Sequence, residues 1–218
     1  MRTPILLALT LMLATGPTFG AGGGSMPSGG MPSMESREPR APEDVARDQY
    51  NGGVRLVEKG DKLAADASHQ KSVDKAGKAY DNALKKFLRA TELNPAMYQA
   101  WNYVGYTNRK LGNYEAALAA YDRALRLKPD YAEAIEYRGH AYLGLNRLSE
   151  AKEAYLALYS ANRQLAAQLL EGMQQWVGAH RENSGGLDVD SFAAWVNERS
   201  SIAGKTASLT REGASAKW

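Results

Sequence analysis

The chain has 218 residues, of which 44% are hydrophobic and 23% are charged, as in an ordinary soluble globular protein. Its 27 basic and 24 acidic side chains are interspersed and give a formal net charge of +3, so the charge pattern does not indicate nucleic-acid binding. Cysteine is absent, which excludes a disulfide framework and leaves the stability of the fold to packing.

The first twenty residues have the pattern of a secretory signal peptide. Arg2 supplies a positive charge, an apolar run extends from Ile5 to Ala14, and the small residues Thr18 and Gly20 precede the expected cleavage point. A membrane anchor is the other interpretation, but the apolar run is about half of the ~20 residues that a spanning helix needs. We therefore expect cleavage after residue 20 and a soluble periplasmic or secreted protein without a membrane span.

Residues 21–43 are rich in glycine and proline and have few large apolar side chains, so we expect a disordered linker. Met26, Met31 and Met34 lie inside it. Thioethers are soft ligands suited to copper(I), so copper handling by this segment is an alternative function. No cysteine or histidine accompanies the methionines, and the plainer interpretation is chance in a low-complexity segment.

From residue 44 to residue 163 the sequence has a helical pattern that repeats. The run from Trp101 to Gly105 (WNYVG) resembles the later run from Ile135 to Gly139 (IEYRG). Pro95 and Pro129 are separated by the same interval. An interval of about 34 residues is typical of arrays of helical hairpins in which each hairpin buries its apolar face against the next.

The unit at residues 98–131 resembles the tetratricopeptide repeat. The positions that carry the resemblance are Trp101, Gly105, Leu111, Gly112, Tyr114, Ala117, Tyr121, Ala124, Leu127 and Pro129. The small residues Gly105 and Ala117 suit a close crossing of the two helices, and Pro129 ends the second helix because it lacks an amide hydrogen. The resemblance implies an all-α fold, an α-solenoid of about three hairpins with a two-helix C-terminal cap.

The first unit, residues 44–97, is longer than the repeat requires. Thirty residues separate Gly53 from Ala83, whereas twelve separate the corresponding glycine and alanine of the next unit. The eighteen additional residues are rich in charge, and they predict a long, protruding helical hairpin. A flexible loop at residues 68–72 is the alternative for part of this insertion.

Beyond residue 131 the resemblance weakens. Residues 132–163 keep the residues that are typical of the repeat at Gly139, Tyr142, Leu145, Ala151 and Tyr155. Arg163 stands where the closing proline would be, so the second helix of this unit should lead closely into the next helix. We expect residues 164–203 to form two capping helices and residues 204–218 to form a disordered tail.

The sequence contains no recognisable catalytic or metal-binding motif. Its histidines, His69, His140 and His180, lie far apart, with no cysteine or second histidine at metal-ligand spacing. Neither the HExxH pattern of zinc enzymes nor the GxSxG pattern of hydrolases occurs. We therefore expect a protein that is not an enzyme and that carries no cofactor.

Members of the tetratricopeptide-repeat family bind partners along a concave groove lined by the first helix of each hairpin. The positions of this sequence that resemble the groove-facing ones are Gln99, Asn102, Tyr106, Arg109, Lys110, Glu133, Glu136 and His140. Asn102 can bond a peptide backbone, Tyr106 offers an aromatic surface, and Arg109 attracts carboxylates. The plainer interpretation is that these residues form the solvated face of two helices.

The resemblance does not extend to the binding of chaperone tails. Chaperone-binding members of the family clamp a terminal carboxylate with a fixed set of lysine, asparagine and arginine, but Tyr103, Glu133 and Tyr137 stand at positions of that set here. The predicted function is a non-catalytic extracytoplasmic scaffold that binds a partner protein or peptide in the groove and no nucleic acid. The alternatives are self-association through the long first hairpin or an array end, as a monomer or weak homo-oligomer, and copper(I) handling by the linker.

Overall fold

The computed structural model describes residues 40–66, 69–182 and 184–215, with side chains up to residue 205. Its helices are α1 (Pro42–Ala65), α2 (Gln70–Leu93), α3 (Tyr98–Lys110), α4 (Tyr114–Leu127), α5 (Ala132–Gly144), α6 (Leu148–Ala161), α7 (Arg163–His180) and α8 (Val189–Ser215). The predicted signal peptide lies outside the described residues. The three methionines of the predicted linker also lie outside them, so the copper hypothesis concerns residues that the structure does not describe. None of the helices in the described part is long and apolar enough to cross a membrane.

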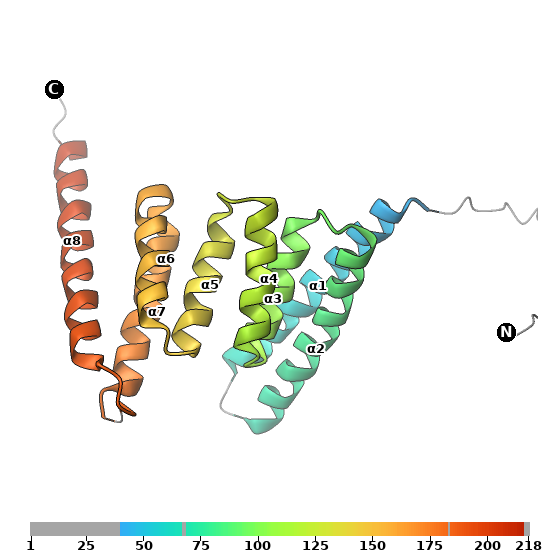
Figure 1. Ribbon diagram of the computed structural model, residues 1–218, viewed down its shortest axis with the longest axis horizontal. Coiled ribbons are helices and arrows are strands. Elements are labelled where there is room, and N and C mark those ends of the chain that lie inside the picture. Colours follow the sequence, from blue (N-terminus) through green and yellow to red (C-terminus); the bar gives the residue numbers. More distant parts are fainter. Residues whose placement is uncertain (1–39, 67–68, 183, 216–218) are drawn as a thin grey trace, which may run out of the picture. The chain divides into compact units, whose positions relative to one another are not determined.

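Each helix packs mainly against its neighbours in the chain (Figure 1). α1 pairs with α2, α3 with α4, and α5 with α6, and the hairpins stack because α2 contacts α3 and α4 contacts α5. The first helices of successive hairpins also touch, α1 with α3 and α3 with α5. α7 covers the third hairpin and α8 covers α7. In the described residues, the predicted all-α solenoid of three hairpins with a two-helix C-terminal cap is confirmed.

The turns that follow α3 and α5 are built alike. Gly112 has a φ of +81°, and the next residue donates its amide to the carbonyl of Asn108 at 2.9 Å. Asn146, at the equivalent place one repeat later, has a φ of +59°, and the next residue donates to the carbonyl of Tyr142 at 2.9 Å. The left-handed conformation favours glycine and tolerates asparagine, so one backbone requirement explains both residue types.

A glycine facing an aromatic ring marks the crossing point of the first two hairpins. A Cβ on Gly105 would lie 2.4 Å from the ring of Tyr121, and a Cβ on Gly53 would lie 2.6 Å from the ring of Phe87. In the sequence, Gly53 and Phe87 are eighteen positions farther apart than Gly105 and Tyr121. The additional residues therefore lie between the crossing and the turn that joins α1 to α2. α1 and α2 have 24 residues each, compared with 13 in α3 and 14 in α4.

The third hairpin packs differently at the equivalent point. Gly139 faces Leu169 of α7, whose Cδ2 would lie 2.6 Å from an added Cβ, and no atom of Tyr155 in its own hairpin is closer. Leu169 belongs to a core that also contains Met173 of α7 and Phe192 of α8. α7 is therefore inserted against α5 as well as α6, which gives the end of the array its apolar centre.

Two boundaries differ from those expected from the sequence. α1 begins at Pro42, inside the segment expected to be linker, because proline suits the first turn of a helix, where its missing amide hydrogen is not needed. α8 continues to Ser215, although residues from 204 onward were expected to form a disordered tail. That stretch contains no proline, and it extends a helix already packed through Phe192 and Val196, so each added residue gains one backbone hydrogen bond.

Candidate partner-binding face

The face formed by α1, α3 and α5 carries the groove residues predicted from the sequence. Gln99, Tyr106, Arg109, Lys110 and His140 are half-buried, Glu133 is exposed, and Asn102 and Glu136 are buried at 2% and 4% exposure. The structure therefore leaves six of the eight side chains accessible to a partner and encloses the other two. In both buried side chains one oxygen, Oδ1 of Asn102 and Oε2 of Glu136, has no hydrogen-bond partner in the described part of the chain.

Four tyrosines form a continuous row across the three helices, and we call these residues the tyrosine row. The ring centroids of Tyr50 in α1 and Tyr103 in α3 are 5.6 Å apart. Tyr103 and Tyr106 are 6.1 Å apart, and Tyr106 lies 5.1 Å from Tyr137 in α5. These separations fall within the range of favourable aromatic pairs, roughly 4.5 to 7 Å. Tyr103 and Tyr106 share one side of α3 because three residues make nearly one helical turn.

The hydroxyl groups of the row are hydrogen-bond donors at neutral pH. Burial raises the pKa of Tyr50 to about 12 and the pKa of Tyr137 to about 12, and it also raises the pKa of Tyr103. Among the described residues these three hydroxyls have no hydrogen-bond partner, and none of them is enclosed. Each can therefore donate to a carbonyl or carboxylate oxygen of a bound molecule.

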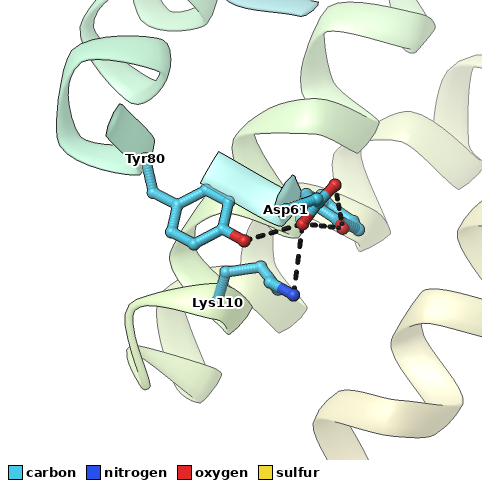
Figure 2. A network of polar contacts seen from close by, with 4 residues as sticks. Asp61, Tyr80 and Lys110 are labelled. Carbon is cyan, nitrogen blue, oxygen red and sulfur yellow. Dashed lines mark hydrogen bonds and ion pairs between the residues drawn. The ribbon is translucent and has the colours of Figure 1, made fainter. Parts of the chain in front are cut away.

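Asp61 of α1 connects the long hairpin to α3 (Figure 2). Its carboxylate accepts a hydrogen bond from the hydroxyl of Tyr80 at 2.7 Å and from the hydroxyl of Tyr106 at 2.8 Å. The Nζ of Lys110 lies 3.2 Å from Oδ1 of Asp61. Burial and the hydrogen bond to Asp61 raise the pKa of both tyrosines. Two of the predicted groove residues, Tyr106 and Lys110, are thus held by a carboxylate of the chain itself.

Arg109 is the groove cation that no carboxylate of the described residues neutralises. Its guanidinium carbon lies 5.2 Å from the ring centroid of Tyr106 and 5.6 Å from that of Tyr137. Arg109 and Lys110 also line a hollow of ≈ 560 Å³ between α3 and the far part of the first hairpin, where Val73 is 43% exposed. Cation–π contacts orient the guanidinium while leaving its charge available to an anion.

On α5 the polar groups are paired with each other. Nε2 of His140 lies 2.8 Å from Oε1 of Glu136. The imidazole fits against α7 because Gly172 has no side chain, and a Cβ there would lie 2.2 Å from Cε1 of His140. Glu133 has no ion-pair partner within the described residues. In that part of the chain no three histidine, aspartate or glutamate side chains are grouped so that they could hold a metal ion.

Sequence reasoning missed three members of the tyrosine row as binding residues, and it missed Asp61. The repeat offered a signal for two of them, because Tyr103 and Tyr137 occupy the same position in successive units. Tyr50 lies three residues before Gly53 and Tyr103 two residues before Gly105, so the row does not follow the repeat in α1. Asp61 lies in the insertion, where no other unit provides a residue for comparison.

The fold is that of a helical-repeat protein. Two sequence models, both described as tetratricopeptide repeat, match residues 71–132 and 132–165. The chain belongs to the tetratricopeptide-repeat family.

Curated relatives share only part of their length with this chain. A wheat (Triticum aestivum) Hsp70-Hsp90 organizing protein is 34% identical over 118 residues, which cover 50% of this chain and 19% of the relative. The ycf37 protein of Guillardia theta is 30% identical over 86 residues, 37% of this chain and 48% of the relative. The chain thus spans less than half the length of these relatives.

Among solved structures, the second TPR domain of human RPAP3, determined in complex with an HSP70 peptide, is similar at a TM-score of 0.48. It is 21% identical and covers 60% of this chain and 97% of its own. A crystal structure of MamA has a TM-score of 0.42 and 20% identity, and it covers 74% of this chain and 95% of its own.

Proposed function

We propose that the chain is a non-catalytic, extracytoplasmic scaffold that binds an extended segment of a partner protein across α1, α3 and α5. The observation that carries this proposal is the tyrosine row, three of whose hydroxyls have no hydrogen-bond partner among the described residues. Tyrosine and arginine are the residue types that contribute most to binding at protein interfaces, because each combines a large contact area with hydrogen bonding.

The parts of the face would have different roles in binding. The rings of the tyrosine row offer contact area to apolar side chains of the partner, and the free hydroxyls would donate to its backbone carbonyls. Arg109 would take a carboxylate, because its charge has no acidic partner among the described residues. Lys110 contributes less, because Asp61 already neutralises it.

The chemistry of this face supports a partner other than a chaperone tail. The family resemblance places Tyr103 at a position of the carboxylate clamp, and its ring stacks on Phe87 with centroids 4.9 Å apart, so no amide or cation is presented there. The wheat relative's name describes action on other proteins, which supports protein binding as the general function.

Affinity capture with three forms of residues 21–218 tests the binding face. The first is unchanged, the second carries Arg109→Gln and Tyr137→Phe, and the control carries Arg126→Gln and Tyr159→Phe on α4 and α6. These substitutions remove the same charge and the same hydroxyl while keeping the rings. We expect to capture a partner that the unchanged and control forms retain and the second form loses. The purified partner should bind the second form at least about tenfold more weakly than the unchanged form. If all three forms retain the same proteins equally, the proposed face is wrong.

The extracytoplasmic location rests on the predicted signal peptide and has its own test. The full chain and a chain lacking residues 2–20 would be expressed in a bacterium with two membranes, followed by release of the periplasm. We expect only the full chain in the periplasmic fraction, with residue 21 as its first residue by mass spectrometry. Recovery of the unprocessed full chain from the cytoplasm would contradict the proposed location.

A further inference from the structure

The long first hairpin has a second surface on the side turned away from α3. In α1, Val57 belongs to the core shared with α3, and Asp61 reaches Tyr106 of α3. Leu56, Lys59 and Leu63 recur at three- and four-residue steps along a different side of the same helix. Since each residue turns an α-helix by about 100°, this second set lies on another side of α1 than Val57 and Asp61. Leu56 also packs against the core, whereas Lys59 and Leu63 do not belong to it.

These side chains line a groove of ≈ 380 Å³ between α1 and α2. Its lining consists of Leu56, Lys59, Leu63, Lys75, Lys78, Ala79 and Asn82. The two leucines are half-buried and Ala79 is buried, so the floor is apolar, whereas the three lysines are exposed at the rim. α1 packs against α2 and α3, and α2 packs against α1 and α3. No further described helix therefore pairs with this side of the hairpin. We call it the outer groove.

The outer groove is positively charged. Lys59, Lys75 and Lys78 form no ion pair with any described residue, and no acidic residue belongs to the lining. An adjoining hollow of ≈ 420 Å³ shares Lys59 and Leu63 and adds two cations and two carboxylates, Arg55, Lys62, Glu58 and Asp66. Cations therefore outnumber carboxylates by five to two along the continuous surface.

We propose that the outer groove binds an acidic amphipathic helix of a partner protein. A groove between two antiparallel helices receives a third helix as a ridge of side chains. Leu56 and Leu63 are seven residues apart, which is ~10 Å along α1 at 1.5 Å per residue. A partner helix with apolar residues at the same seven-residue step would cover both leucines, and glutamates beside them would meet Lys59 on one side and Lys75 and Lys78 on the other. This surface is separate from the tyrosine row and does not depend on the function proposed for it.

A charge-swap experiment with the full chain tests the outer groove. The probe is a fluorescently labelled helical peptide of about three turns with leucines at seven-residue steps and flanking glutamates, and a second peptide has lysine for each glutamate. The groove variant carries Lys59→Glu, Lys75→Glu and Lys78→Glu. The control variant carries Arg126→Glu, Arg181→Glu and Lys205→Glu, which change the net charge equally at exposed positions outside the first hairpin. Circular dichroism would show that all forms are folded.

We expect the acidic peptide to bind the unchanged and control forms with similar affinity and the groove variant at least about tenfold more weakly. The basic peptide should show the reverse preference and bind the groove variant most tightly. Replacing Leu63 with Asn should weaken the acidic peptide without restoring binding of the basic one. The preference should shrink as salt rises from about 0.05 M to 0.5 M, because the lysines are exposed. Neither the groove variant nor the control variant changes Arg109 or the tyrosine row, so this result is separate from the outcome for the function proposed above.

Several outcomes would overturn the proposal. No binding of the acidic peptide up to about 1 mM would do so, and so would equal losses in the groove and control variants. Vesicles containing anionic phosphatidylglycerol are the second probe, and their binding in place of the peptide would make the groove a membrane-facing surface. Light scattering of the protein alone would expose a further alternative, since a dimer that the groove variant abolishes would make the occupant a second copy of the chain.

Discussion

The first and second hairpins share one packing rule and differ in what lies beyond it. Each has a glycine against an aromatic ring at the crossing, Gly53 on Phe87 and Gly105 on Tyr121. The second hairpin ends soon after its crossing, whereas the first continues, and Asp61 lies in the continuation. The comparison shows that a repeat accepts a long insertion when the insertion is added at the end of the hairpin that carries the connecting turn. The added residues then supply contacts that the repeat itself does not contain.

Filling the crossings should have the largest effect. Gly53→Ala and Gly105→Ala place a methyl group within 3 Å of a ring, so each should lower the free energy of unfolding by about 1–3 kcal/mol. Gly77→Ala is the control, because nothing lies within 4 Å of its added Cβ, and it should raise stability by up to about 1 kcal/mol. Urea unfolding monitored by circular dichroism measures all three. Losses at Gly53 no larger than at Gly77 would show that the two crossings are not equivalent.

Removing the negative charge of Asp61 should be the next largest effect. Asp61→Asn removes the ion pair with Lys110 and weakens two hydrogen bonds from phenols, so we expect a loss of about 1–2 kcal/mol in urea unfolding, given that the carboxylate is partly exposed. Asp122→Asn is the matched control, because Asp122 pairs with Arg138 alone at 2.9 Å and should lose less than about 1 kcal/mol. Equal losses in the two variants would mean that the phenols add nothing to the attachment of the long hairpin.

The turns provide a smaller comparison between the second and third hairpins. Gly112→Ala and Asn146→Ala each place alanine in the left-handed conformation and should each lower the free energy of unfolding by about 1 kcal/mol. Gly178→Ala has open space around its Cβ and no positive φ, so it should be neutral or stabilising. Thermal unfolding of the three variants checks the order. A neutral Gly112→Ala variant would show that the turn can adopt another conformation.

The tyrosine row should make the free energy of unfolding depend on pH only in alkaline solution. Because burial raises the pKa of Tyr50 and Tyr137 from 10 to about 12, the native state keeps protons that the unfolded state has lost between these pH values. The stabilising contribution is therefore complete below pH 10 and disappears as the pH rises through about 12. Absorbance titration at about 295 nm should show late ionisation that Tyr50→Phe and Tyr137→Phe each reduce. Ionisation of both near pH 10 would contradict their burial.

The sequence predicted the repeating parts of the fold because repetition supplies internal comparisons. Gly105, Tyr121 and Gly112 have consensus types at consensus spacing, and each residue type answers a local requirement of backbone or packing. The replacement of Gly112 by Asn146 in the next unit is understandable once the shared positive φ is known. Such features can be predicted from the requirements of a single hairpin.

The candidate site was less accessible to sequence reasoning because its properties depend on several helices at once. Helical spacing places Asn102 and Glu136 on the groove side, but it does not show how closely the next helix approaches, and both side chains are buried. The attachment of Asp61 to Tyr106 crosses from the insertion to the next hairpin, where no repeat constrains the register. The contact of Gly139 with α7 also lay beyond the repeat pattern, because α7 belongs to the cap.

The Asp61–Tyr106 hydrogen bond has a consequence for the order of folding. Most helix contacts in the described residues join neighbours in the chain, a topology of low contact order that folds fast. The bond between Asp61 and Tyr106 joins residues 45 positions apart, and it forms only after both hairpins are in place. This hydrogen bond should therefore be among the last contacts made and the first broken. The part of the first hairpin between the Gly53 crossing and the turn to α2 should then open separately and exchange its amide hydrogens while the crossing stays closed.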